Sequence, residues 1–260
     1  MPELPEAECY RRVAEQAVGR RVAEVVAPDV WYLKGATDQA ALDRALVGRP
    51  VTEVWRHGKR VCVGVGSDHV LGLQFGMTGI LELDGNAALD GLRYAPRRRD
   101  DAWVRFALRF EDGGVLGLVD PRRLGGVTLD PDLEGLGPDA ATIGQAALAR
   151  ALAASAVPVK ARLLDQSVLA GVGNLLGDEV LWRSGVDPRR PARDLGRAVS
   201  RRLHRHLVAT IAELVERGGS HLGDLVAERR PGGRCPRDGS ALVRTTVGGR
   251  TTWWCPTHQR

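Results

Sequence analysis

The hydrophobic pattern of the chain changes type once, and this change limits the folds open to it. Before residue 129, short β-branched or alternating runs between Gly, Asp and Pro predict strands. They lie at 21–26, 61–65, 71–75, 80–83, 103–110 and 115–119. After residue 139, Ala- and Leu-rich segments with helical spacing predict helices at 144–154, 160–168, 174–184 and 197–217. Because a run of turn formers, 129–139, separates the two regions, we expect an α+β protein with a boundary there.

Smaller elements are expected at the two ends. Pro5 opens an amphipathic pattern over 5–18 that predicts one helix. Near the C-terminus, 242–247 and 250–254 flank Gly248-Gly249, a two-residue loop suited to a type I′ hairpin. The sequence thus predicts three parts: a helix with a β-sandwich or barrel over 1–135, a helical domain over 136–230, and a hairpin over 231–260.

Composition excludes several classes of protein. The chain has 260 residues, of which 43% are hydrophobic, so it can bury a large core and is not a disordered tail. No apolar run approaches the roughly 20 residues that span a bilayer, and the first residues are acidic where a signal peptide is basic. The four cysteines do not form the framework of a secreted protein. We therefore expect a cytoplasmic protein with reduced cysteines.

Positive charge is concentrated in the second half of the chain. Residues 183–205 hold eight Arg against two Asp, and residues 229–260 hold seven Arg against one Asp, an excess of six in each segment. Such clustering favours a polyanionic partner, because each phosphate that is neutralised releases counterions. The alternative is a solvated Arg-rich surface, since the excess of Arg over Lys also fits coding bias.

Six short motifs follow one another along the chain. They are Pro2-Glu3-Leu4-Pro5-Glu6, His57-Gly58-Lys59-Arg60, Gly76-Met77-Thr78-Gly79, Asp120-Pro121-Arg122-Arg123, Gly171-Val172-Gly173-Asn174 and the C-terminal hairpin with Arg250. In these motifs and their order the chain resembles the bacterial formamidopyrimidine-DNA glycosylase and endonuclease VIII family. The resemblance implies a helix-two-turn-helix domain, a zinc-finger-like hairpin, and a monomeric enzyme of the bacterial cytoplasm. That enzyme would be a glycosylase and abasic-site lyase acting on damaged double-stranded DNA.

The first motif predicts an amine nucleophile. Loss of Met1, which a small second residue permits, frees the secondary amine of Pro2 to attack C1′ of a damaged nucleotide. The adduct is a permanently cationic iminium that favours strand cleavage by β- and then δ-elimination. By the resemblance, Glu3 protonates the opening sugar and Glu6 supports the site. The pentapeptide alone is more typical of a helix start.

Three residues are candidates for phosphate contacts. Lys59 is expected at the entry to a strand, where its ammonium would act as a point charge. Asn174 begins a predicted helix, whose exposed amides would also suit a phosphate, and it matches the family's phosphate-binding position. Arg250 follows the hairpin turn and would enter a groove or hold phosphates. The alternatives are a solvated lysine for Lys59 and a helix N-cap for Asn174.

Excision of a base requires that the base leave the stack and that the gap be filled. Met77, between Gly76 and Gly79, is a candidate apolar wedge, although it could instead fill a gap in the core. Arg122 matches the family residue that inserts opposite the orphaned base. Leu124 stands where many family members have Phe.

The last candidate site is a metal site. Cys235 and Asp238, then Cys255 and His258, have the paired spacing of a zinc ribbon, with Asp and His at two positions where the family usually has Cys. Asp238-Gly239 could equally be a turn. The alternative is a finger without zinc, held together by the packing of Trp253 and Trp254.

Two other functions compete with the repair enzyme. One is a catalytically silent DNA-damage-binding protein of the same fold, and the other is a structural nucleic-acid protein. Neither requires Pro2. The opening motif favours oxidised purines as substrates, whereas the short segment before Cys235 suits oxidised pyrimidines or bulkier adducts.

Overall fold

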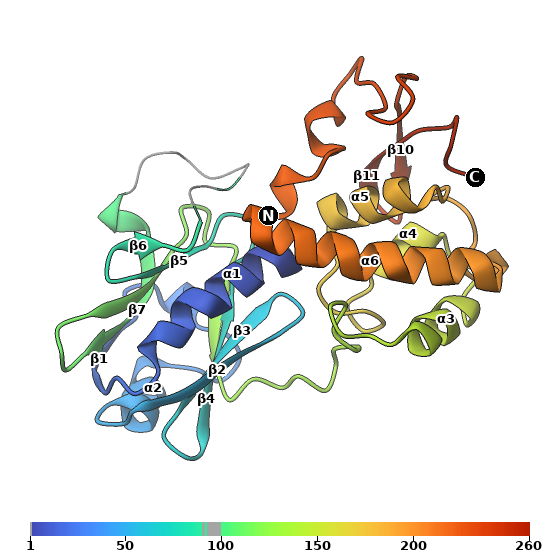
Figure 1. Cartoon of the computed structure of the whole chain (residues 1–260). Helices are drawn as coiled ribbons and strands as arrows, with labels where there is room; N and C mark the ends of the chain where they lie inside the picture. The colour runs from blue at the N-terminus through green and yellow to red at the C-terminus, as the bar shows by residue number, and fades with distance from the viewer. Residues whose placement is uncertain (1, 90–91, 93–99) are drawn as a thin grey trace. The chain divides into compact units, whose positions relative to one another are not determined.

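The structure is a computed structural model that describes residues 2–89, 92 and 100–260 (Figure 1). Met1, whose removal the proline chemistry requires, lies outside the described residues. Helices and sheets are both present, as the sequence predicts, and the chain divides into two compact units. The first unit contains Glu6–Leu133, and the second contains Glu134–Arg260 together with Glu3–Pro5. No helix in the described ranges is long and apolar enough to cross a membrane.

The first unit is a helix with two antiparallel sheets. Helix α1 (Leu4–Ala14) opens the chain and continues as a 3-10 turn. One sheet has the strand order β1-β7-β8-β5-β6, with bounds Val22–Val26, Val104–Phe110, Val115–Val119, Ile80–Leu83 and Asn86–Ala87. The other has the order β2-β3-β4-β9, with bounds Val51–His57, Arg60–Val65, His69–Gln74 and Gly126–Leu129. Side chains of both sheets and of α1, such as Leu108, Val63 and Tyr10, share one apolar core.

Three strands and one helix of this unit were not predicted. Strand β2 buries only Val51 and Val54, which are three residues apart, so it lacks the alternation that predicts a strand, and β6 is only two residues long. Strand β9 ends at residue 129, where the run of turn formers begins. Helix α2 (Gln39–Leu46) did carry a signal, because the Asp38 side chain caps it by accepting the Ala41 N–H at 2.7 Å.

The second unit contains four helices and a hairpin among its described residues. The helices are α3 (Gln145–Ala153), α4 (Val159–Leu164), α5 (Asn174–Ser184) and α6 (Arg197–Arg217), and the hairpin strands are β10 (Val243–Val247) and β11 (Arg250–Trp254). Gly248 and Gly249 both have positive φ, as the predicted type I′ turn requires. The prediction for α4 was too long. It ends at Leu164 because the Asp165 carboxylate accepts the Ser167 N–H and stabilises a turn instead.

Candidate functional site

Glu3 is held at the start of α5. Its two carboxylate oxygens accept hydrogen bonds from the N–H groups of Leu175 and Leu176, at 2.8 and 2.9 Å, and the residue is 1% exposed. Leu4 adds a backbone bond from its N–H to the Gly171 carbonyl at 3.1 Å. A carboxylate in this position satisfies two amides that a helix start leaves unpaired and complements the helix dipole. Glu3 and Leu4, which belong to the second unit, are thereby held in place although they are remote from α5 in sequence.

Close packing explains the glycine at position 173 of the Gly171-Val172-Gly173 link. A Cβ on Gly173 would lie 2.2 Å from the carboxyl carbon of Glu3. A side chain at this position would therefore displace the catalytic candidate. Pro2 and Glu6 are also buried, Glu6 with 1% exposure.

The N-cap interpretation of Asn174 is wrong. Gly173 is the N-cap of α5, Asn174 is the first helical residue, and its Oδ1 is buried without a hydrogen-bond partner among the described residues. The expectation that the backbone amides at this helix start are open to a phosphate is also wrong for two of them, because the N–H groups of Leu175 and Leu176 bind Glu3. What this helix start offers a phosphate is the Asn174 side chain.

The positive charge of the second unit is less available than its sequence suggests. Arg183 forms ion pairs with Glu179, Glu213 and Asp224 at 2.8, 2.5 and 2.9 Å. The pKa of Glu213 is lowered to about 2, and the hydrogen bond from Arg183 is the largest cause. Other arginines are exposed, among them Arg193, Arg197, Arg201, Arg205, Arg244 and Arg250. Arg250, at the start of β11, pairs with Val247 across the hairpin, whereas Lys59 lies half-buried between β2 and β3.

The candidate wedge residues lie on two turns of the first unit. Met77 is half-buried and Arg122 is exposed, and Leu124 is 52% exposed. Both turns contact the buried carboxylate of Asp120, to which Thr78 donates a hydrogen bond at 2.6 Å. Burial, followed by the Asp120 charge, raises the pKa of Tyr32, whose hydroxyl lies 3.4 Å from the same carboxylate. Asp120 was part of a motif in the sequence, but no role for it was inferred.

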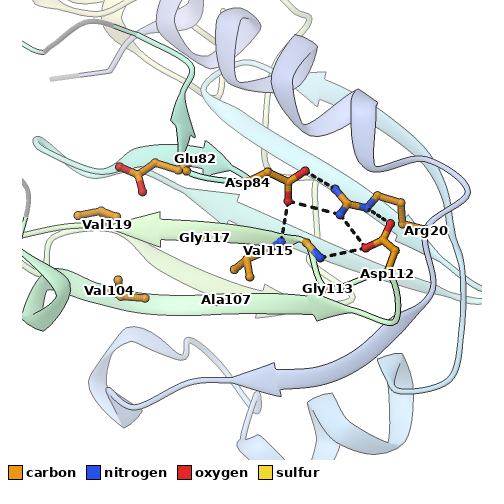
Figure 2. Close-up of a pocket in the computed structure, with 12 residues that line it drawn as sticks. Arg20, Glu82, Asp84, Val104, Ala107, Asp112, Gly113, Val115, Gly117 and Val119 are labelled. Carbon is orange, nitrogen blue, oxygen red and sulfur yellow. Dashed lines mark hydrogen bonds and ion pairs between the residues drawn. The ribbon is translucent and has the colours of Figure 1, made fainter.

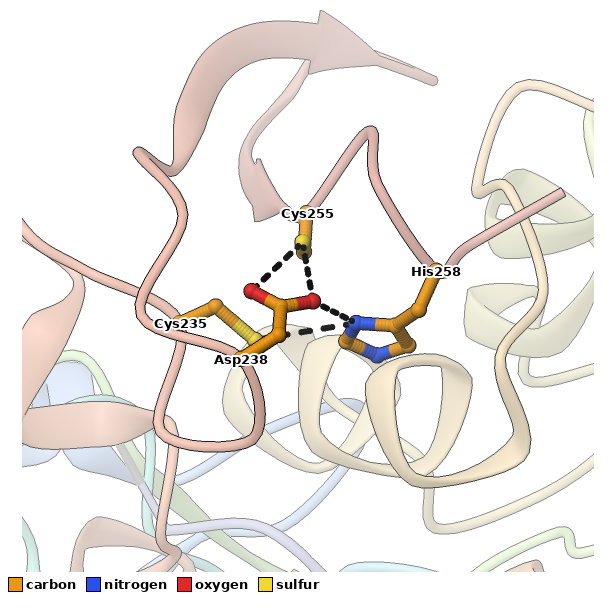
Figure 3. A group of neighbouring side chains, drawn as sticks. All are labelled: Cys235, Asp238, Cys255 and His258. Atoms are coloured by element: carbon orange, nitrogen blue, oxygen red, sulfur yellow. Dashed lines mark hydrogen bonds and ion pairs between the residues drawn. The ribbon is translucent and has the colours of Figure 1, made fainter.

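The four candidate metal ligands come together in the second unit (Figure 3). Their ligand atoms all lie within 4.8 Å of one another. The separations are 3.6 Å from Cys235 Sγ to His258 Nδ1, 3.4 Å from Cys255 Sγ to Asp238 Oδ2, and 3.0 Å from His258 Nδ1 to Asp238 Oδ2. Tetrahedral zinc with sulfur, nitrogen and oxygen ligands separates its donors by about 3.3–3.8 Å. The two separations that involve a sulfur lie in this range, while the nitrogen–oxygen separation is shorter, so the four residues could hold a metal ion after a small adjustment of His258 and Asp238.

The surroundings of the cluster also bear on the alternatives. His258 Nε2 lies 3.2 Å from the Trp182 carbonyl, a partner that would leave Nδ1 free to bind a metal. Asp238 serves both interpretations, because Oδ1 accepts the Ser240 N–H at 2.9 Å, as in a turn, while Oδ2 faces His258. A small apolar core that includes Trp182 and Trp253 lies beside the cluster.

A buried ionic group in the second unit was missed by the sequence analysis. Lys160, fully buried, lies 2.6 Å from Asp178, which Arg229 also contacts at 2.8 Å. Lys160 donates further to the Thr252 hydroxyl at 2.7 Å, which links α4 and α5 to β11. Burial lowers the pKa of Lys160 despite its carboxylate partner. Sequence spacing gives no signal for an ion pair between residues that are this far apart in the chain.

One hollow of the first unit lies away from these residues (Figure 2). It measures about 730 Å³ and is lined by residues of the five-stranded sheet and by Arg20, which pairs with Asp84 and Asp112 at 2.8 and 2.7 Å. None of the predicted site residues lines it.

Two known protein-family models match the chain, one in each of the two units. Residues 1–127 match the family model of the formamidopyrimidine-DNA glycosylase N-terminal domain, and residues 135–225 match that of the H2TH domain. Over its full length the chain is 36% identical to the formamidopyrimidine-DNA glycosylase of Thermus thermophilus, covering 98% of that protein. It is 33% identical to the enzyme of that name from Alkalilimnicola ehrlichii, with both chains fully covered.

Solved structures agree with the sequence comparison. The complex of Lactococcus lactis Fpg with abasic-site DNA is similar with a TM-score of 0.83 and 25% identity, over 99% of each chain. The complex of that Fpg with N7-benzyl-Fapy-dG DNA matches with the same score and identity over both full chains. Because the family models cover most of the chain and the relatives match it from end to end, this protein belongs to the formamidopyrimidine-DNA glycosylase family.

Proposed function

We propose that the protein is a DNA repair glycosylase with abasic-site lyase activity, and that Pro2 is its nucleophile. The observation that carries the proposal is the family match across both units of a chain that has Pro2-Glu3 at its start. Relatives are named formamidopyrimidine-DNA glycosylases, and the similar Fpg structures contain damaged or abasic DNA. We expect a monomer of the bacterial cytoplasm whose partner is double-stranded DNA.

The proposed reaction begins with the free amine of Pro2. Its nitrogen bonds to C1′, the bond from C1′ to the base breaks, and the base leaves with a proton. Glu3 supplies a proton as the sugar ring opens, and its fixed position at α5 limits the orientations of its carboxylate. The iminium then acidifies the C2′ hydrogens. Loss of one of these protons to a base breaks the C3′–O bond and expels the phosphate there, which is β-elimination, and loss of a second proton, from C4′, breaks the C5′–O bond and expels the other phosphate, which is δ-elimination. Glu6, buried on the first turn of α1, supports this site.

The direct test is borohydride trapping on duplex DNA with an abasic site. A covalent protein–DNA adduct and cleaved strands are expected, because only an amine catalyst leaves a reducible iminium. DNA binding without an adduct would favour the catalytically silent damage binder.

Lys59, Asn174 and Arg250 are proposed to contact phosphates, while Met77, Arg122 and Leu124 are proposed to fill the gap left by the extruded base. Substitution of each phosphate residue by Ala should weaken binding with little change in lesion preference, because phosphate contacts carry no base information. Lys59→Ala and Arg250→Ala should also reduce the salt slope by roughly one each, whereas neutral Asn174→Ala should scarcely change it. Measurement of DNA affinity at salt concentrations from about 50 to about 200 mM tests these expected slopes. An unchanged slope for Lys59→Ala would remove it from the phosphate contacts.

We also propose that Cys235, Asp238, Cys255 and His258 hold a structural zinc ion, which would stabilise the hairpin that carries Arg250. Purified protein should then contain about one zinc per chain. Chelation should lower DNA affinity while both apolar cores stay folded, because metal binding stabilises only the element that needs it. Metal content, circular dichroism and DNA binding measure these effects.

Two variants test whether Asp238 is a metal ligand or only a turn residue. Asp238→Ala should lose zinc, whereas Ser240→Ala, which removes only the hydroxyl that donates to Asp238 Oδ1 and keeps the backbone N–H bond of the turn, should retain it. Equal metal content in both variants would make Asp238 a turn residue. Metal-free protein with full DNA affinity and an ordered hairpin would favour the finger without zinc.

A further inference from the structure

Asp120 is a fully buried carboxylate that joins two turns of the first unit. Its Oδ1 accepts hydrogen bonds from the Thr78 hydroxyl at 2.6 Å and from the Arg122 N–H at 3.1 Å. Thr78 is also fully buried. This pair of bonds connects the turn 76–79, which carries Met77, directly to the backbone of Arg122.

The second oxygen fixes the rest of the loop. Asp120 Oδ2 accepts the N–H groups of Leu124 and Gly125, at 3.0 and 2.9 Å. Arg123, which lies between Arg122 and Leu124, has a φ of +57°, an unusual conformation for a residue with a side chain, and its guanidinium binds Asp29 at 2.6 and 2.7 Å. The loop 120–125 is therefore held in one conformation, with Arg122 and Leu124 exposed.

The two turns also touch through their backbones. Gly76 has a φ of +56°, and a Cβ there would lie 2.3 Å from the Leu124 carbonyl carbon. The two backbones are therefore in direct contact, with no room for a methyl group between them. A displacement of the Met77 turn toward the loop would therefore displace the backbone that follows Arg122 as well.

We propose that Asp120, through Thr78, makes the Met77 turn and the Arg122 loop one rigid insertion unit, so that both side chains enter the DNA gap together. Asp120 and Thr78 are positioning residues and touch no substrate. The proposal rests on the proposed function and deepens it, because it states how two separate segments of sequence fill one gap. A buried hydrogen bond to a charged acceptor is among the stronger kinds, which suits it to this task.

Thr78 offers a matched pair of variants. Thr78→Val keeps the shape but removes the donor to Asp120, whereas Thr78→Ser keeps the hydroxyl. With Thr78→Val, excision of a damaged base from duplex DNA should fall about tenfold in kcat/KM, as the loss of one such bond implies. Trapping on single-stranded abasic DNA, which has no partner base and no gap to fill, should stay within about twofold. Thr78→Ser should match the wild type on both substrates.

A double-mutant cycle gives a readout that general destabilisation would not produce. Met77→Ala and Arg122→Ala should be non-additive in the wild-type background, because either change disturbs the same unit, and additive in the Thr78→Val background. Additivity in both backgrounds, or equal loss on single-stranded DNA, would overturn the proposal. A wild-type protein that excises no base would instead overturn the proposed function, so the two failures are distinguishable.

Discussion

Protein that retains Met1 is expected to lose covalent trapping on abasic DNA by more than about a thousandfold, the order of loss seen when a nucleophile is removed. In that form the Pro2 nitrogen is a tertiary amide and has no lone pair to attack C1′. The form can be prepared by inhibiting methionine aminopeptidase during expression, so that the rest of the sequence is unchanged. Borohydride trapping and mass spectrometry measure the loss. Affinity for uncleavable DNA should change little, because the proposed phosphate contacts lie elsewhere in the chain.

The control uses the same protein. Protein that retains Met1 is treated with purified aminopeptidase under conditions that expose its N-terminus. Covalent trapping should then be restored in proportion to the Met1 removed. The site of any adduct is located by mass spectrometry, because the Met1 α-amine can itself form a reducible imine. Undiminished trapping at an amine other than the N-terminal one would show that Pro2 is not the nucleophile.

The second large effect is expected for Glu3→Gln. Base excision should fall by about 10² to 10⁴, the range for loss of a general acid or base, while lyase action on a pre-formed abasic site should fall much less. The amide has one acceptor oxygen for the two N–H groups of Leu175 and Leu176, so stability should also fall by about 1 kcal/mol. Single-turnover rates on the two substrates, with thermal unfolding, separate these effects.

Asp38→Asn is the matched control. It makes the same carboxylate-to-amide change at the start of another helix, α2, where Asp38 accepts the Ala41 N–H. Excision should be unchanged in this variant. Equal loss of excision and lyase activity in Glu3→Gln would contradict the proposed role and indicate that Glu3 acts only as a helix cap.

The sequence predicts those parts of the fold that have a local signal. Helix α6 shows apolar residues at helical spacing and Gly218 at its end, and the hairpin shows its glycine pair, so both were predicted closely. Strand β2 was missed because its two buried residues are three positions apart and do not alternate, and β9 was missed because it ends where the run of turn formers begins.

Parts of the site escape such reasoning for a different reason. The four candidate metal ligands are paired by spacing, and the structure brings their side chains together. The contacts of Glu3 with α5, of Lys160 with Asp178 and of Thr78 with Asp120 join residues far apart in sequence. Periodicity carries no information about such pairs, and the motifs identified the residues without their partners.

The attachment of Glu3 and Leu4 to the second unit sets an order of events during synthesis. Leu4 is fully buried in a core built from residues after 139, and its partner Gly171 is made long after it. At about 5–20 residues per second, roughly 10 to 35 s separate the translation of Pro2 from that of Leu176. Throughout that interval the N-terminus has no site in which to dock. If Pro2 acts as proposed, methionine aminopeptidase is therefore expected to remove Met1 in the nascent stage, before the folding that buries Pro2.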